Sequence, residues 1–242
     1  MENRDFLAYL QPKADARTGE ICGAEALIRY QDSENGMIAP ARFLRAIEKA
    51  GLIRHMDLFI LREVCRMMRQ WMDQGWKPFP ISVNYSRVTI LESNILKETN
   101  EITEEFLIPK NLIEIEVTES VGSTDSGSLS NVISCFRRDG YRIALDDFGA
   151  EYSNIYMLYT LELTSLKLDR RIVADLFKDR RAKIVVEGVI HTCKKLGITC
   201  VAEGVETAEN KDEMRAMSCD VIQGYYLDKP ICEEEFFQKY IK

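Results

Sequence analysis

The chain has 242 residues, of which 46% are apolar and 29% charged, the composition of an ordinary globular protein with room for a sizeable core. Its formal charge is −7 and its lysines and arginines form no stripe, which argues against a groove for long nucleic acid. No run of about 18 apolar residues occurs, so no transmembrane segment is predicted. The first residues lack the apolar stretch of a signal peptide, and seven cysteines without a C-x-x-C pair favour a reducing cytoplasm.

Short β-like segments alternate with segments of helical periodicity along the chain. The predicted strands are Phe6–Pro12, Gly23–Tyr30, Phe79–Tyr85, Ile113–Thr118, Arg142–Phe148, Ser165–Leu168, Ile198–Glu203 and Val221–Leu227. The predicted helices are Asp57–Gly75, Ser128–Arg138, Arg181–Leu196 and Ala208–Met217. No linker rich in proline, glycine or serine interrupts the pattern. We therefore expect a single domain over residues 1–242. Such a domain could be one part of a longer signalling protein.

The alternation of strands and helices favours a parallel sheet, because parallel neighbours need a long crossover connection. A closed (β/α)₈ barrel of about 250 residues fits the chain length, and an open, doubly wound sheet is the alternative. The segment Lys13–Ile21 between the first two strands is too short for a helical crossover and suits a hairpin. The prediction is a TIM-like (β/α)₈ barrel whose first strand is antiparallel.

One face of each predicted strand is polar, because side chains two residues apart share a face. These faces and strand ends carry Glu25, Leu27 and Arg29; Ser82 and Asn84; Glu114 and Glu116; Asp146 and Asp147; Ser165, Lys167 and Asp169; Glu203; and Gln223. If the polar faces point into the barrel, several carboxylates meet there. Buried charges must be paired or bound to metal, and oxygen ligands suit hard divalent cations such as Mg²⁺ or Mn²⁺.

The adjacent carboxylates Asp146 and Asp147 at a strand end indicate two cations rather than one. Two ions roughly 3.5–4 Å apart suit in-line attack of water on a phosphodiester. A solvated charge or an ion pair explains any single carboxylate equally well, but explains the whole set poorly. The histidines His55 and His191 lie in helical segments without a ligand-spaced partner, which disfavours zinc chemistry.

A series of motifs in a fixed order resembles the EAL domain family of cyclic di-GMP phosphodiesterases. The blocks are A-E-A-L-I-R at 24–29, S-V-N at 82–84, E-I-E-V-T-E at 114–119, D-D-F-G at 146–149, L-K-L-D at 166–169, V-A-E-G-V-E at 201–206 and Q-G-Y at 223–225. The resemblance covers essentially the whole chain. It implies metal-dependent opening of cyclic di-GMP to linear pGpG, with two divalent cations, Mg²⁺ or Mn²⁺.

The resemblance also implies a role for each matching residue. The metal ligands would be Glu25, Asn84, Glu116, Asp146 and Asp147, and the catalytic group would be Glu203, Lys167 and Glu25. The substrate would contact Gln11, Leu27, Arg29 and Gln223, while Glu119 and Glu206 would support the loop after Asp147. A homodimer and an upstream sensory or GGDEF-type domain are further expectations from the family.

The loop after the paired aspartates departs from the family pattern D-D-F-G-T-G-Y-S-S. Here Ala150 and Glu151 follow Gly149, so that a hydroxyl is lost and a carboxylate replaces a glycine beside an acidic site. One hypothesis is that the loop adopts another allowed conformation with little effect. The alternative is a non-catalytic or weakly active cyclic di-GMP receptor. A third hypothesis, a two-metal hydrolase for another phosphoester, needs only the carboxylates.

Overall fold

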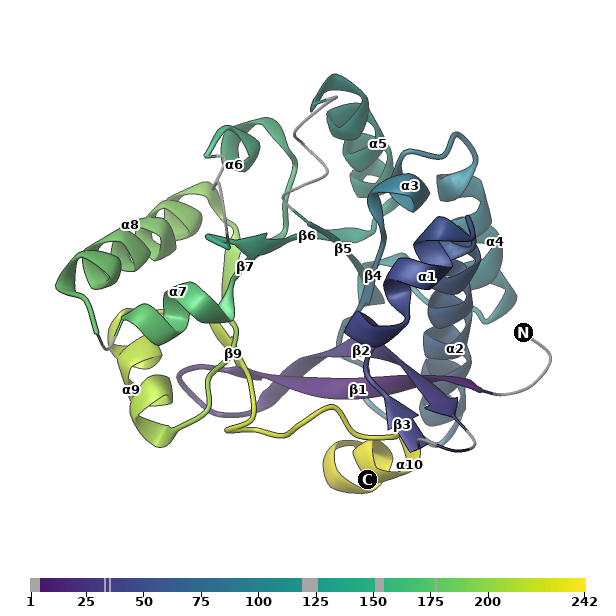
Figure 1. The fold of residues 1–242 in the computed structure, drawn as a ribbon, viewed down its shortest axis with the longest axis horizontal. Helices are drawn as coiled ribbons and strands as arrows, with labels where there is room; N and C mark the ends of the chain where they lie inside the picture. Colours follow the sequence, from purple (N-terminus) through teal and green to yellow (C-terminus); the bar gives the residue numbers. More distant parts are fainter. Residues whose placement is uncertain (1–4, 33, 35, 119–125, 151–154, 177) are drawn as a thin grey trace.

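The computed structural model describes residues 5–32, 34, 36–118, 126–150, 155–176 and 178–242, and its strands close into a barrel ringed by helices (Figure 1). The barrel strands are β1 (Phe6–Asp15), β2 (Ile21–Asp32), β4 (Ile81–Asn84), β5 (Ile113–Thr118), β6 (Arg142–Phe148), β7 (Ser165–Leu168), β8 (Thr199–Ala202) and β9 (Val221–Gln223). Strand β1 pairs antiparallel with both β2 and β9, and the other neighbours around the barrel are parallel. The predicted barrel with an antiparallel first strand is confirmed, and the open sheet is ruled out. A short strand, β3 (Gly36–Ile38), extends β2 as an antiparallel neighbour.

The hairpin between β1 and β2 is encoded by its turn residues. The Asp15 carboxylate accepts hydrogen bonds from the backbone N–H groups of Arg17 at 2.9 Å and Thr18 at 2.7 Å. Gly19 follows with a φ of 78°, a conformation that costs glycine little. The turn reverses the chain without a helix, so β1 runs against its neighbours.

Helices cover the outer side of the barrel (Figure 1). In chain order they are α1 (Leu44–Lys49), α2 (Ile53–Asp73), α3 (Arg87–Ile90), α4 (Ile95–Glu105), α5 (Ser126–Asp139), α6 (Tyr156–Thr160), α7 (Arg170–Asp175), α8 (Arg180–Leu196), α9 (Ala208–Ala216) and α10 (Glu233–Phe236). The apolar faces of the strands, for example Ile113 and Ile115 of β5, are fully buried in one core beneath these helices. The polar faces are thereby left to line the barrel interior.

Helix α2 begins four residues earlier than the predicted start at Asp57. An acidic residue at that place in the sequence is typical of a helix N-terminus. In the fold the Asp57 carboxylate instead accepts hydrogen bonds from the Ser86 N–H at 2.9 Å and the Thr89 hydroxyl at 2.6 Å. Asp57 thus serves the start of α3, and α2 runs past it.

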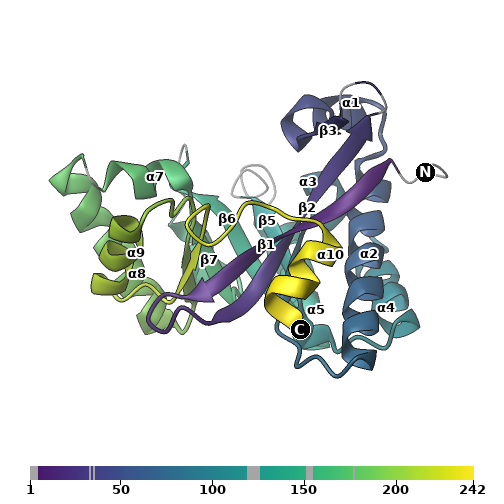
Figure 2. The ribbon, with the colours of Figure 1, turned by 90° about the horizontal axis from the view of Figure 1, so that it is seen from below.

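The C-terminal segment covers the side of the barrel where the β1–β2 hairpin lacks a crossover helix (Figure 2). Leu10 of β1 and Ile231 exchange two backbone hydrogen bonds, of 2.8 and 3.0 Å. Phe236 of α10 stacks on Trp71 of α2 with ring centroids 5.9 Å apart. Aromatic burial of this kind stabilises the contact between the last and the first thirds of the chain.

Strand β9 ends at Gln223, earlier than the predicted Leu227. At Gly224 the chain approaches the backbone of Val205 so closely that a Cβ atom would lie 2.2 Å from the Val205 carbonyl oxygen. The Tyr226 N–H donates to that same oxygen at 2.9 Å. The residues after Gln223 therefore pair with the loop after β8 rather than continue the barrel.

No helix within the described part of the chain is both long and apolar enough to cross a membrane. All seven cysteines are free thiols, and four of them (Cys65, Cys193, Cys200 and Cys219) are buried in the core. They pack as small apolar side chains.

Candidate metal centre

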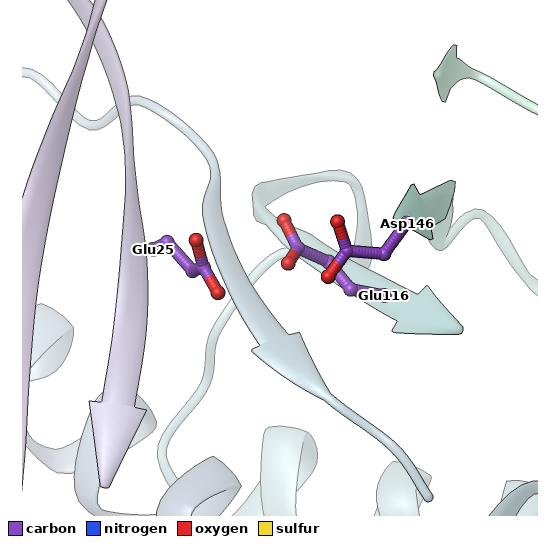
Figure 3. A group of neighbouring side chains, drawn as sticks. All are labelled: Glu25, Glu116 and Asp146. Carbon is purple, nitrogen blue, oxygen red and sulfur yellow. The ribbon is translucent and has the colours of Figure 1, made fainter. Parts of the chain in front are cut away.

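Three buried carboxylates from separate strands meet where the parallel strands end. Glu25 of β2, Glu116 of β5 and Asp146 of β6 each offer one oxygen within 4.8 Å of the others. Figure 3 shows their carboxylate groups turned toward one another inside the barrel. The strand register brings them together, because Glu25 pairs with Ser82, two residues before Asn84, and Asn84 pairs with Glu116.

A second group shares Asp146 with the first. Oxygens of Asp146, Asp147 and Glu203 lie within 4.8 Å of one another. Among the described residues, these are the two groups of acidic, histidine or cysteine side chains with metal-ligand spacing. We call Glu25, Glu116, Asp146, Asp147 and Glu203 the acidic cluster. Each group would offer carboxylate oxygens to a divalent cation, and Asp146 belongs to both groups.

The backbone at Asp147 explains how two consecutive carboxylates serve one site. Successive side chains of a regular strand point to opposite faces. Asp147 has a φ of 58°, and the β6–β7 register shifts between Leu145 and Phe148. The Asp147 N–H donates to Asp146 Oδ1 at 2.9 Å. A left-handed non-glycine residue costs on the order of 1–2 kcal/mol, and such strain is typical of functional sites.

Lys167 of β7 lies at the centre of the acidic cluster. Its Nζ is 3.2 Å from Glu25 Oε2, 2.6 Å from Glu116 Oε2, 3.1 Å from Asp146 Oδ1 and 2.8 Å from Glu203 Oε1. Burial alone would lower the pKa of this ammonium, but the surrounding carboxylates, Asp146 first, hold the pKa of Lys167 well above its ordinary value. Lys167 therefore stays charged.

One ammonium does not neutralise the cluster, and the carboxyl groups respond differently. Burial raises the pKa of Glu203 to about 8, against the attraction of Lys167. Burial likewise raises the pKa of Glu25, helped by the charge of Glu116, and the pKa of Asp146. Burial would raise the pKa of Glu116 too, but Lys13 and Lys167 together lower it to about 2.

This donor set fits divalent cations. The cluster offers carboxylate oxygens and no sulfur or imidazole, which is the ligand type that Mg²⁺ and Mn²⁺ prefer. The carboxylates of Glu25, Glu116, Asp146 and Glu203 face only two ammonium groups among the described residues, those of Lys13 and Lys167, so negative charge is left uncompensated there. Cations of charge +2 would supply the missing compensation.

The three predicted amide side chains lie around Glu25. Asn84 Nδ2 donates to Glu25 Oε1 at 2.9 Å, and Gln223 Nε2 donates to Glu25 Oε2 at 2.6 Å. Gln223 Nε2 also lies 3.1 Å from Gln11 Oε1, and Gln11 Nε2 donates to the Asp228 carbonyl at 3.1 Å. Gln223 Oε1 is buried and has no hydrogen-bond partner in the described part of the chain, so it can accept from a water or a ligand.

Two hollows open beside the acidic cluster and share Glu25, Leu27 and Asp146. The first, of about 280 Å³, is also lined by Gln11, Lys167, Arg170, Glu203, Gly204, Glu206, Gln223, Gly224 and Tyr225. The second, of about 340 Å³, extends toward α1 and α2 and is more apolar. Among the described residues, Leu27 is the one apolar side chain that lines both hollows.

Of the two remaining predicted residues, Arg29 lies near Glu25 and Tyr225 of the first hollow without lining it, and Glu119 is not described. Arg29 lies outside the residues lining either hollow; its guanidinium donates to the Ile28 carbonyl at 2.8 Å and lies 5.9 Å from the ring centroid of Tyr9. Glu119 lies outside the described residues, as do residues 151–154 of the altered loop. The hypothesis about that loop is thus not decided by the fold.

One member of a polar layer beneath the acidic cluster, Lys13, was missed by the sequence analysis, which had already placed Ser82, Glu114 and Ser165 on polar strand faces. We call Lys13, Ser82, Glu114 and Ser165 the lower layer: on β4, β5 and β7 its members precede Asn84, Glu116 and Lys167 by two residues. Lys13 Nζ lies 3.3 Å from Glu114 Oε2 and 2.8 Å from Glu116 Oε1. Period-two alternation could have identified Lys13, since it is two residues from Gln11 and shares its face of the strand. It was missed because the strand was predicted to end at Pro12.

The sequence profile of the EAL domain matches residues 1–230. The chain is 33% identical over 236 residues to MucR of Pseudomonas aeruginosa, a bifunctional diguanylate cyclase and cyclic di-GMP phosphodiesterase, covering 97% of this chain and 34% of that protein. It is 34% identical over 230 residues to the cyclic di-GMP phosphodiesterase PA2567 of the same organism, covering 95% of this chain and 39% of that protein. The chain thus spans little more than a third of the length of these relatives.

The fold agrees with the sequence comparison. The structure of the MucR phosphodiesterase in complex with cyclic di-GMP superposes with a TM-score of 0.92 at 31% identity, covering 97% of this chain and 95% of that one. The profile match, the identity along the chain and the shared barrel lead to one conclusion: the chain belongs to the EAL domain family, which includes cyclic di-GMP phosphodiesterases.

Proposed function

We propose that this chain hydrolyses cyclic di-GMP to linear pGpG with two divalent cations, Mg²⁺ or Mn²⁺. The observation that supports this most is the pair of carboxylate groups sharing Asp146 at the mouth of the barrel. Relatives at about a third identity include cyclic di-GMP phosphodiesterases, one of them solved with cyclic di-GMP bound. Cations held by Glu25, Asn84, Glu116, Asp146 and Asp147 would supply a nucleophilic water and positive charge for the phosphoryl oxygens.

The side chains around that water divide the remaining work. Water forms a bond to phosphorus while the bond from phosphorus to the ribose 3′ oxygen breaks. The water must lose a proton, and the leaving 3′ oxygen takes up a proton from solvent to become a hydroxyl. Glu203 would accept the proton from the water, because it lies at the edge of the cluster beside Asp146 and Asp147, with its Oε1 held by Lys167 at 2.8 Å. Lys167 stays protonated and binds the phosphoryl oxygen on which charge develops.

The two hollows would receive the two halves of the dinucleotide on either side of Leu27. Gln11 and Gln223 would orient the ligand from the first hollow, and Gln223 Oε1 is a free acceptor among the described groups. Arg29 would bind a phosphate through N–H groups other than the one that donates to the Ile28 carbonyl. Glu119 and Glu206 would support the loop after Asp147.

The test is turnover by the purified chain with Mg²⁺ or Mn²⁺, with pGpG measured by chromatography and the oligomeric state, proposed to be a homodimer, measured by light scattering. Glu25→Ala should lower the rate at least about a thousandfold, since it removes a ligand from the first cation site. Glu105→Ala, an exposed carboxylate paired with Arg62, is the control and should keep the parental rate. No turnover by a dimeric, metal-loaded protein would refute the proposal.

Two other results would identify the alternatives. Tight binding of cyclic di-GMP without hydrolysis would indicate the receptor that the altered loop suggests. Faster hydrolysis of another cyclic nucleotide or phosphodiester would indicate a different substrate for the same two-metal chemistry.

A further inference from the structure

Glu116 is the carboxylate of the acidic cluster that is held from two sides. Lys167 contacts its Oε2 at 2.6 Å, and Lys13 of the lower layer contacts its Oε1 at 2.8 Å. Glu116 is only 1% exposed. Both oxygens are thus fixed by charge-assisted hydrogen bonds in a site without bulk water, where such bonds are strong and directional.

Lys13 is itself fixed from below. Its Nζ lies 2.5 Å from the Ser82 hydroxyl and 3.3 Å from Glu114 Oε2, and Glu114 accepts further hydrogen bonds from Ser82 at 2.8 Å and Ser165 at 2.6 Å. These groups come from β1, β4, β5 and β7, so the lower layer ties one side of the barrel to the other. Lys13 therefore has little freedom to move away from Glu116.

The neighbouring strand leaves space for this lysine. Lys13 pairs with Gly23 across the β1–β2 hairpin. A Cβ atom at position 23 would lie 3.8 Å from both Cβ and Cδ of Lys13 and 3.2 Å from the Pro80 carbonyl oxygen. A side chain larger than alanine would enter the space beside the aliphatic part of Lys13. The close approach at position 23 is to the Pro80 carbonyl oxygen, while the distances to Lys13 are ordinary van der Waals contacts.

We propose that Lys13 is a positioning residue for the metal centre: by holding one oxygen of Glu116, it fixes the orientation in which Glu116 binds a divalent cation. The inference rests on the proposed function, because it assigns Lys13 a role in the same two-metal site. Groups that orient metal ligands in this way typically contribute 10–100-fold to metal affinity.

Positioning and plain electrostatics predict opposite results. An ammonium beside a cation site repels the cation, so removing the charge of Lys13 would by itself tighten metal binding. Removing an orienting contact leaves Glu116 free to turn and weakens binding. The sign of the change in metal affinity therefore distinguishes the two effects.

The experiment is calorimetric titration of metal-free protein with Mn²⁺ alone. Lys13→Met should weaken Mn²⁺ binding by about tenfold or more relative to the parent. The double variant Lys13→Met/Glu114→Gln removes one positive and one negative charge, and it should bind Mn²⁺ as weakly as the single variant. Equal or tighter binding by Lys13→Met, or parental affinity in the double variant, would overturn the proposal.

A matched pair of serine variants decides the matter even if Lys13→Met does not fold. Ser82→Ala removes a hydroxyl that contacts both Lys13 and Glu114. Ser165→Ala removes an equally buried hydroxyl that contacts Glu114 but not Lys13. Ser82→Ala should weaken Mn²⁺ binding several-fold more than Ser165→Ala, and equal affinities would refute the positioning role.

Two controls distinguish a change in Mn²⁺ affinity from a loss of folding stability and from a failure of the proposed function. Tyr141→Phe removes a buried hydroxyl that contacts Thr103 and Asn100, outside the barrel interior, and should lower the unfolding midpoint with Mn²⁺ affinity unchanged. A parent that binds no Mn²⁺ would refute the proposed function and this inference together. A parent that binds Mn²⁺ and hydrolyses cyclic di-GMP, with Lys13 variants of equal affinity, would refute only the role of Lys13.

Discussion

The two polar layers inside the barrel both pair buried carboxylates with a lysine but differ in charge balance. In the lower layer the Glu114 carboxylate has Lys13 at 3.3 Å and Arg142 at 3.6 Å, and although burial opposes it, the charge of Lys13 lowers the pKa of Glu114. In the acidic cluster above it, four carboxylates share the ammonium of Lys167, and burial raises the pKa of three of them, Glu25, Asp146 and Glu203.

The difference shows how one barrel can hold both a structural and a reactive set of charges. In the lower layer, a buried ion pair whose other hydrogen bonds are satisfied holds its side chains in one fixed arrangement. A buried cluster with uncompensated negative charge destabilises the metal-free fold and favours cation binding in return. Glu116 belongs to the acidic cluster but is bonded to Lys13, so it connects the two layers.

The largest expected effect is that of Lys167→Met. Removing the ammonium leaves four carboxylates without their common partner, and breaking a buried ion pair from one side costs about 3–5 kcal/mol. Urea unfolding with a chelator present should show this loss, and added Mn²⁺ should restore part of it by binding the folded state. The exposed pair of Arg62 with Glu105 is the control: Arg62→Met should cost less than about 1 kcal/mol. Equal losses in the two variants would contradict the comparison.

A smaller loss is expected for Glu114→Gln in the lower layer. The substitution keeps the shape of the side chain but removes its negative charge. The Glu114 carboxylate faces Lys13 and accepts hydrogen bonds from the hydroxyls of Ser82 and Ser165. Hydrogen bonds to charged groups contribute about 1.5–3 kcal/mol, so the free energy of unfolding should fall by that amount at pH 7. Because the pKa of Glu114 is lowered in the folded state, the difference from the parent should shrink as the pH falls through that pKa. A gain in stability would mean that the lower layer is strained rather than balanced.

Most of the barrel could be predicted from the sequence because its signals are local. Short β-like segments between helical patterns located every barrel strand, and the short Lys13–Ile21 segment indicated the reversed first strand. Helix α4 was missed because its buried face includes Thr99 and Thr103, which weaken the apolar period. Their hydroxyls donate to the Ile95 and Thr99 carbonyls, respectively, which makes their burial possible.

The part of the candidate site that lies on the strands and at their ends could be predicted from the sequence. The residues of the acidic cluster follow from alternation and from the motif order, and the fold brings them together. The left-handed backbone at Asp147 was not predictable, since nothing in the pair Asp146-Asp147 requires it. Nor was the bond from Lys13 to Glu116, which joins strands far apart in the sequence and depends on barrel closure.

The most discriminating prediction concerns Glu203, and the sign of its pH dependence is opposite to that of Glu114. Burial raises the pKa of Glu203 from 4.5 to about 8, so between these values the unfolded chain releases a proton that the folded chain keeps. This contribution to stability is fully present below pH 4.5 and is lost as the pH rises through 8, with a slope of up to about 1.4 kcal/mol per pH unit. Glu203→Gln should therefore flatten the decline in the free energy of unfolding of metal-free protein between pH 5 and 8, as measured by urea titration in a chelator. A slope remains from Glu25 and Asp146, whose pKa values are also raised.

The control is Glu114→Gln, which should leave this decline in place because the pKa of Glu114 is lowered. A slope unchanged by Glu203→Gln would contradict the comparison, because it would show that Lys167 already neutralises the acidic cluster.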